Sequence, residues 1–445
     1  MSYLDLLKTH RPFRSLWYGQ VVSELGDWLN SIAIYALILQ LSGTGMAMAG
    51  AMMAKLLPIF LVSPVAGVVV DRMSRKKVMI ITDILRCFIV LGLLWVEDAG
   101  DLWLLYSLVV LEIAMAGFFE PARSAIIPSL IPRKNLVTAN ALSGSTWSVM
   151  LAFGAALGGA VVSLLGIRAA FILDAMTFLV SAAFILRIPS GMENMEGRKK
   201  SARQGGFKNL IEGGRYLISE PIVMVLALLK SGLAVSGGIM TLIPLYAHQM
   251  LGSPTSLSMW IGLMYSARGI GAAAGPILVK RVFGDSSLVL QSATAAGFFL
   301  GAVSILLLGV SPGLWTATVC IGLATFFGSI IWVFSSAMIH MEAEEGYLGR
   351  VFSTEMGLLT LVMGISNWAV GFTVDELHLS LREVAFWMAG LFAVPGILWM
   401  GFLLFVHNRL KQGKSVGSVS PVDPSGFNPC PTNPLNNPTE GKSGF

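Results

Sequence analysis

Apolar runs of about 20 residues recur along the first 406 positions of this chain. Each run is long enough to cross a hydrocarbon core of roughly 30 Å as an α-helix, and in lipid a helix satisfies its own backbone polar groups. Only 12% of the residues are charged, whereas soluble domains contain about 25%. The chain is therefore predicted to be a polytopic helical membrane protein.

Polar segments separate twelve such runs. Short matches at a shared offset of 212 residues, such as Pro64 with Pro276, indicate a duplicated six-helix unit. We therefore predict an all-α fold of twelve transmembrane helices in two six-helix bundles, residues 1–188 and 216–407, with a cytoplasmic linker at 189–215. The Pro- and Asn-rich tail, 408–445, is predicted to be disordered. The predicted spans are 16–41, 46–70, 78–96, 102–119, 140–163, 168–187, 220–247, 257–280, 287–309, 313–338, 352–374 and 385–406.

The basic residues predict the orientation of these spans. With the N-terminus inside, 24 Lys and Arg residues fall in cytoplasmic segments, and only Arg168 and Arg382 fall in outer loops. Because cytoplasmic loops are enriched in these residues, both termini are expected on the cytoplasmic side. The net charge of +5 then reflects topology, and no nucleic-acid partner is expected. The polar start of the chain lacks a small-residue cleavage site, so no signal peptide is predicted.

Two acids lie inside the first span. Glu24 and Asp27 are three residues apart and share one helix face, with Asp27 about 16 Å into the membrane. Two close carboxylates in a low dielectric do not both ionise cheaply, so at least one is expected to hold a proton. This chemistry suits a proton carrier, and Asp27 is the preferred residue because it lies deeper. The alternative is that either acid pairs with a basic group on a neighbouring helix.

Other ionisable residues inside spans of the first half are candidates for a cavity or for ion pairs. Asp83 and Arg86 are one turn apart in span three, which favours a local or interhelical ion pair. Lys55 is midway along span two and is a candidate partner of Asp27. Glu112, in span four, is a further candidate, and the role of Asp174 in span six stays open between function and structure.

Lys230 and Arg268 are the two charges predicted to lie well inside spans of the second half. Either they line a cavity and attract an anionic substrate, or they close salt bridges between helices. The sequence does not separate these two interpretations.

The segment between spans two and three carries a dense charge pattern, Gly-Val-Val-Val-Asp-Arg-Met-Ser-Arg-Lys-Lys, from Gly67 to Lys77. Gly67 is small enough to let two helices approach closely. Four cations beside Asp71 are typical of a cytoplasmic loop, and the simplest interpretation is a topology anchor.

The spacing G-x-x-x-D-R-x-x-R-K of this segment resembles the signature loop of the major facilitator superfamily, with Ser74 where that family usually has glycine. The stretch from Gly154 to Gly159 is similar to the superfamily's span-five antiporter motif, with alanine replacing proline. Two further stretches, Glu-Pro-Ala-Arg at 120–123 and Ala-Asn-Ala-Leu at 139–142, resemble the bacterial exporters of macrolides, other drugs and enterobactin.

This resemblance implies two halves that rock about a central cavity in the inner membrane of a bacterium. It also implies a cytoplasmic charge cluster that controls which way the cavity opens. The residues assigned to this gate are Gly67, Asp71, Arg72, Arg75, Lys76 and Arg123.

We therefore predict a proton-coupled exporter of an amphipathic small molecule, which is drug-like, macrolide-like or siderophore-like. It is expected to act as a monomer in the lipid bilayer, with no cofactor and no metal ion. One rival is a transporter without proton coupling: a facilitator, or a lipid or siderophore carrier driven by another gradient. The other rival, a membrane-embedded enzyme, is disfavoured because no His-x-x-Glu-His, Gly-x-Ser-x-Gly or nucleotide-binding motif occurs.

Overall fold

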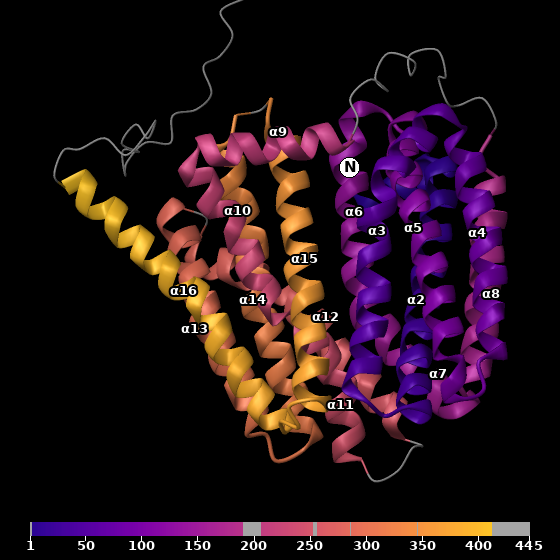
Figure 1. The fold of residues 1–445 in the computed structure, drawn as a ribbon. Coiled ribbons are helices and arrows are strands. Elements are labelled where there is room, and N and C mark those ends of the chain that lie inside the picture. Colours follow the sequence, from indigo (N-terminus) through magenta and orange to yellow (C-terminus); the bar gives the residue numbers. More distant parts are fainter. Residues whose placement is uncertain (1, 190–205, 252–255, 285, 345, 412–445) are drawn as a thin grey trace, which may run out of the picture. The chain divides into compact units, whose positions relative to one another are not determined.

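The computed structural model describes residues 2–189, 206–251, 256–284, 286–344 and 346–411, with side chains placed except at 206–211 and 407–411. Within these ranges the chain forms helices and no strand. The long helices run side by side, as Figure 1 shows. The described residues up to Trp399 form one compact unit, and those from Met400 onward belong to a second.

The first part of the chain forms eight α-helices. Short 3₁₀ helices occur at Leu93–Trp95, Ala99–Asp101 and Arg133–Asn135, and a π-helical turn, η4, spans Met150–Gly154 between α6 and α7. The α-helices are α1 (Tyr3–Thr9), α2 (Arg11–Leu41), α3 (Gly45–Arg72), α4 (Arg75–Gly92), α5 (Leu102–Leu130), α6 (Leu136–Val149), α7 (Ala155–Leu165) and α8 (Ile167–Leu186).

The described residues of the second part form eight further α-helices, with a 3₁₀ segment, Val235–Gly238, joining α10 to α11. They are α9 (Gly206–Ser219), α10 (Pro221–Ala234), α11 (Ile239–Met250), α12 (Leu257–Phe283), α13 (Ser287–Gly309), α14 (Leu314–Glu342), α15 (Leu348–Asp375) and α16 (Leu381–Lys411).

Eleven helical stretches among the described residues are long and apolar enough to cross a membrane. The predicted span outside this set corresponds to α12, which has 27 residues and is as long as the others. Arg268 inside this helix, with Lys280 and Arg281 at its end, makes it less apolar. The all-α polytopic fold is thus confirmed, whereas the predicted domain boundaries stay a prediction.

At three places a helix extends beyond the span that the sequence predicted. The predicted loop at 120–139 is helical as far as Leu130, although Pro121 and Pro128 lie inside α5. Prolines are tolerated in membrane helices because neighbouring helices and side chains satisfy the freed backbone groups. The end of the predicted linker is also helical, since α9 begins at Gly206, and α16 continues to Lys411, past the predicted start of the tail. Residues 190–205 and 412–445 lie outside the described residues.

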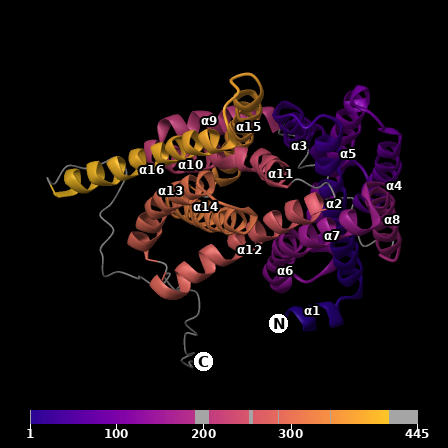
Figure 2. The same cartoon turned by 90° about the horizontal axis from the view of Figure 1, so that it is seen from below.

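Glycines set the closest helix contacts. A Cβ atom at Gly262 in α12 would lie 2.5 Å from the Ala155 carbonyl oxygen, and one at Gly159 in α7 would lie 2.6 Å from the Ser258 carbonyl oxygen. Figure 2 shows α12 alongside α7. The small residues of the predicted span-five motif therefore allow two backbones to touch, as in small-residue packing of membrane helices generally.

We predict that Gly262→Ala lowers the free energy of unfolding by about 1–3 kcal/mol, because the new methyl group must displace backbone atoms. Unfolding of the purified protein in detergent measures the effect. Gly390→Ala in α16 is the matched control, since a Cβ atom there would have nothing within 4 Å. Equal stability of the two variants would show that α7 and α12 can move apart to accommodate the methyl group without a measurable cost.

Candidate functional site

A cavity of about 640 Å³ lies among α2, α3, α4, α5 and α6. Six of the charged side chains that the sequence singled out in the first half face it. They are Glu24 and Asp27 from α2, Lys55 from α3, Arg86 from α4, and Glu112 and Arg123 from α5.

A second cavity, of about 620 Å³, lies between the C-terminal end of α2, the segment that follows α4, and the junction of α7 and α8. Its charged side chains, Glu97 and Arg168, form an ion pair with a 2.9 Å contact, and both are largely exposed. Exposed pairs of this kind contribute little to stability or chemistry. The first cavity is therefore the candidate functional site.

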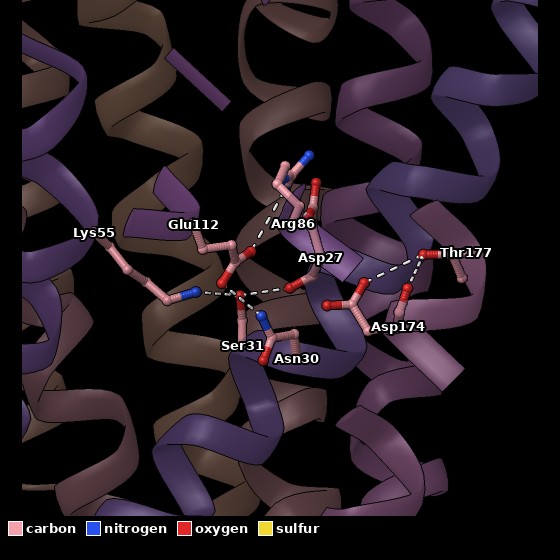
Figure 3. Close-up of polar contacts among 8 residues, drawn as sticks. All are labelled: Asp27, Asn30, Ser31, Lys55, Arg86, Glu112, Asp174 and Thr177. Atoms are coloured by element: carbon pink, nitrogen blue, oxygen red, sulfur yellow. Dashed lines mark hydrogen bonds and ion pairs between the residues drawn. The ribbon is translucent and has the colours of Figure 1, made fainter. Parts of the chain in front are cut away.

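Arg86 is the centre of the site. Its Nη2 atom donates to Asp27 Oδ1 and lies 3.5 Å from Glu112 Oε1, while Asn30 Nδ2 donates to Glu112 Oε2 over 2.8 Å (Figure 3). The guanidinium carbon lies 4.1 Å from the centre of the Phe178 ring. Arg86 thus makes the interhelical ion pair that the sequence favoured, and its partners come from α2 and α5 rather than from its neighbour in α4.

The two members of the Asp27–Arg86 pair differ in exposure. The Asp27 side chain is 38% exposed, whereas Arg86 and Glu112 are each 4% exposed. Since Asp27 lines the cavity, its exposed surface faces that space. One carboxylate is therefore accessible from the cavity, and the cation that holds it is buried behind it.

Lys55 lies close to Asp27 without forming an ion pair with it. Lys55 Nζ donates to Ser31 Oγ over 2.5 Å, and Ser31 Oγ donates to the Asp27 carbonyl oxygen over 2.6 Å. The Lys55 ammonium also lies 5.5 Å from the centre of the Tyr35 ring. The predicted partnership between Lys55 and Asp27 is thus indirect, through a serine of the next helical turn (Figure 3).

Glu24 belongs to a second chain of contacts along the same cavity. Gln20 Nε2 donates to Glu24 Oε1 over 2.7 Å, and Arg123 Nη1 donates to Gln20 Oε1 over 2.8 Å. Arg123 also pairs with Glu120, with a 2.6 Å contact. Glu24 Oε2 is buried and has no hydrogen-bond partner among the described residues. Glu24 and Asp27 therefore face one cavity, as their spacing predicted, but in separate networks.

The predicted charge cluster of Asp71 with Arg123 does not form in this structure. Arg123 is a helical residue of α5 that faces the cavity, and no hydrogen bond or ion pair joins Asp71 to another described residue. Gly67 also differs from the expectation of a close helix contact, because nothing lies within 4 Å of a Cβ atom there. The glycine faces open space in this conformation.

The short turn between α3 and α4 is held by other contacts. It consists of Met73 and Ser74, and the Ser74 side chain caps α4 by accepting from the Lys77 backbone. Arg75 Nη1 donates to the Ala125 carbonyl oxygen of α5, and Lys76 Nζ donates to the Leu186 carbonyl oxygen at the end of α8 over 3.0 Å. Arg72, the last residue of α3, is exposed. The basic residues thus fasten α4 to its neighbours.

In the second half, Lys230 makes a buried ion pair with Glu355, with a 2.9 Å contact between Nζ and Oε2. The sequence interpretation missed Glu355 because the predicted span began at 352, which placed the acid at a helix end. In the structure α15 begins at Leu348, so Glu355 lies inside the helix and is fully buried. Of the two interpretations left open for Lys230, the salt bridge is correct.

Arg268 forms no ion pair with a described residue. Its guanidinium carbon lies 5.9 Å from the centre of the Tyr265 ring. Tyr265 in turn stacks on Tyr35 of α2, with ring centres 5.6 Å apart. Arg268 therefore faces aromatic rings rather than a carboxylate.

The polytopic helical fold and a polar cavity inside it define a membrane transporter of the major facilitator type. The crystal structure of a bacterial homologue of the iron transporter ferroportin matches 90% of this chain and 99% of its own, with a TM-score of 0.65 and 17% identity, which shows the shared fold. The chain belongs to the family described as transmembrane secretion effector, whose model matches residues 7–347.

Several bacterial transporters are related in sequence. The MFS-type transporter YfiS of Bacillus subtilis is 24% identical over 92% of this chain and 96% of its own length. Macrolide efflux protein A of Streptococcus pyogenes is 26% identical over 79% of this chain and 87% of its own. The enterobactin exporter EntS of Escherichia coli O1:K1 / APEC is 26% identical over 78% of this chain and 82% of its own. The resemblance derived from the motifs is thus confirmed.

We predict that breaking the Lys230–Glu355 pair from one side destabilises the protein by about 3–5 kcal/mol, because the remaining ion is left buried without a partner. Lys230→Met and Glu355→Gln test this by unfolding in detergent. The double variant should recover much of the loss, since it leaves no unpaired charge. A double variant as unstable as the sum of the two single variants would contradict this account.

Proposed function

We propose that this protein exports an amphipathic small molecule in exchange for protons, by alternating access of the cavity among α2–α6. The observation that carries the proposal is the Asp27–Arg86 pair, in which a cavity-facing carboxylate is held by a buried arginine. Titratable groups inside membrane spans are costly to keep and mark proton and substrate pathways.

Proton binding at Asp27 changes the energy of this conformation. Protonation removes the negative charge that Arg86 contacts, so the network on α2, α4 and α5 loses part of its electrostatic stabilisation. A ligand shifts a conformational equilibrium only through different affinities for the two states. The proton meets this requirement if the other state of the transporter lacks the ion pair. Glu24, with its unpartnered oxygen in the same cavity, is the second candidate for proton binding.

The chemistry of the cavity supports an amphipathic substrate. Its wall combines the acids with the aromatic side chains of Trp28, Phe119 and Trp147. Aromatic surfaces beside a few placed polar groups are typical of small-molecule sites. Macrolide efflux protein A and EntS carry export of a macrolide and of enterobactin in their names, and large molecules with both polar and apolar faces are therefore the substrate class that we propose.

The two ends of the helices supply the gates in this proposal. At one end, the predicted cytoplasmic segment with Gly67, Asp71 and Arg72 is free to change partners, while Arg75 and Lys76 hold α4 in place. At the other end, the Asp375 carboxylate at the end of α15 accepts from the Gly45 and Met46 backbone nitrogens over 2.9 Å and 2.7 Å.

The contact at Asp375 is a latch between α3 and α15. A carboxylate at a helix N-terminus is stabilised by the helix dipole and by free backbone N–H groups. A Cβ atom at Gly371 would lie 2.8 Å from the Gly45 carbonyl oxygen, so α3 and α15 touch there. With both termini in the cytoplasm of a bacterium, this latch closes the outer side of the inner membrane in a monomeric transporter.

We predict that Asp27→Asn lowers proton-driven transport by about 5- to 150-fold, the range expected when a coupling free energy of 1–3 kcal/mol is lost. Purified protein in liposomes, under an imposed pH gradient, is assayed with a macrolide, a catecholate siderophore and a cationic dye. Glu376→Gln is the control, since Glu376 is exposed at the end of α15. Transport by Asp27→Asn at the wild-type rate would instead favour a facilitator without proton coupling.

We predict that Asp375→Asn opens the α3–α15 end more often, because an amide lacks the charge that the helix dipole stabilises. Spin labels at Met46 and Glu376 should show a larger population of long distances, measured by pulsed electron paramagnetic resonance. The matched control is Glu97→Gln, which removes an exposed acid at another loop. An unchanged distance distribution would show that Asp375 does not hold the α3–α15 end closed.

A further inference from the structure

A second group of acids lies behind the cavity, between α2, α4 and α8. Asp83 on α4 and Asp174 on α8 are both fully buried. Neither of them lines the cavity. Figure 3 shows Asp174 beside Asp27, on the far side of α2 from Lys55.

Several polar atoms of this compartment have no partner. Asp174 Oδ1 accepts from Thr177 Oγ1 over 3.2 Å, but Asp174 Oδ2 has no hydrogen-bond partner among the described residues. Among the described residues Asp83 has no ionic partner, its neighbour Ser181 is too poorly aligned for a regular hydrogen bond, and Arg86 Nε also lacks a partner. Two buried acids therefore lie beside a buried arginine that has an unpaired N–H group.

The packing of α2 against α8 makes room for these groups. A Cβ atom at Gly26 would overlap both Asp174 Oδ1 and Thr177 Oγ1, and one at Gly19 would lie 3.2 Å from Ser181 Oγ. The two glycines are seven residues apart on α2, and Asp174 and Ser181 are seven residues apart on α8. On α2, the residues opposite the polar side chains of α8 are therefore glycines, which have no side chain to fill that space.

The charges around Asp83 and Asp174 do not balance if every acid is ionised. Asp27, Glu112, Asp83 and Asp174 surround Arg86, and among the described residues Lys55 is the other cation close to this group, beside Asp27. Two negative charges are left over, and a buried carboxylate without a partner is strongly disfavoured. The groups that face Asp83 or Asp174 are Asp27 on α2, Arg86 and Cys87 on α4, Glu112 and Glu120 on α5, and Thr177 and Ser181 on α8, while Lys55 on α3 lies near Asp27.

We infer that Asp83 and Asp174 are a second pair of proton-binding carboxyl groups, which are neutral while Arg86 is paired with Asp27 and Glu112. They are the two acids without an ionic partner, so they are the ones that hold the two missing protons. Their role extends the proposed coupling from the cavity into the protein interior.

Arg86 connects the two groups of acids. When a proton from the cavity neutralises Asp27, Arg86 loses that partner, and its free N–H groups turn to Asp174 or Asp83. The acid that receives Arg86 then releases its own proton. One proton is gained and one is lost, so the charge of the compartment stays the same while the ion pair moves from the cavity side to α8.

The protonation state is measured directly by infrared spectroscopy of the full chain in liposomes at neutral pH. Wild-type protein should show C=O stretching bands of two buried carboxylic acids that exchange slowly with deuterium. Asp83→Asn and Asp174→Asn should each remove one band. Thr177→Val should shift the Asp174 band without removing it, because it deletes only the hydrogen-bond donor.

Asp27→Asn tests the exchange of partners. It imitates a neutral Asp27, so Arg86 should move and one of the two bands should disappear. An unchanged spectrum in Asp83→Asn or Asp174→Asn, with folding verified by gel filtration, would overturn the assignment of that acid. Bands that persist in Asp27→Asn would overturn the exchange. Because no transport is measured, these outcomes are independent of whether Asp27 couples transport to protons.

Discussion

The ion pair of Arg86 with Asp27 and Glu112 is the interaction on which the first half of the structure depends. Moving an ion from water into a low dielectric costs several kcal/mol, and only close partners of opposite charge offset that cost. The partners of Arg86 come from α2 and α5, so this one arginine ties three helices together. The same cost makes the network sensitive to protons, because neutralising one carboxylate changes the balance for all of its members.

Glycine positions explain how such a network fits between helices. Gly26 on α2 leaves space for Asp174 and Thr177, and Gly154 packs against Trp28 on the other side of α2, where an added Cβ atom would lie 3.0 Å from the indole ring. In membranes, helices associate through close packing and interhelical polar contacts, since lipid supplies no hydrophobic drive. The polar residues of α2 thus meet partners on several sides because small residues let those helices approach.

The sequence predicted the spans well because their length and hydropathy are fixed by the bilayer rather than by packing. It did not predict where α5 ends, since Pro121 and Pro128 look like loop residues until neighbouring helices satisfy the backbone. The sequence also did not predict which residues pair across helices. Spacing places Glu24 and Asp27 on one face, but only the tertiary fold brings Arg86 to Asp27. Glu355 was missed because hydropathy locates a span end less accurately than one helical turn.

The halves of the protein use buried charge differently. The Lys230–Glu355 pair is closed, with both side chains almost fully buried, and one cation meets one acid. Around Arg86 the acids outnumber the cations, and one of them is exposed to the cavity. A balanced pair leaves no net charge in the interior, whereas an unbalanced group leaves buried charge that is costly unless protons neutralise it. The first half therefore holds the candidate proton-binding groups, whereas the buried ion pair of the second half ties α10 to α15.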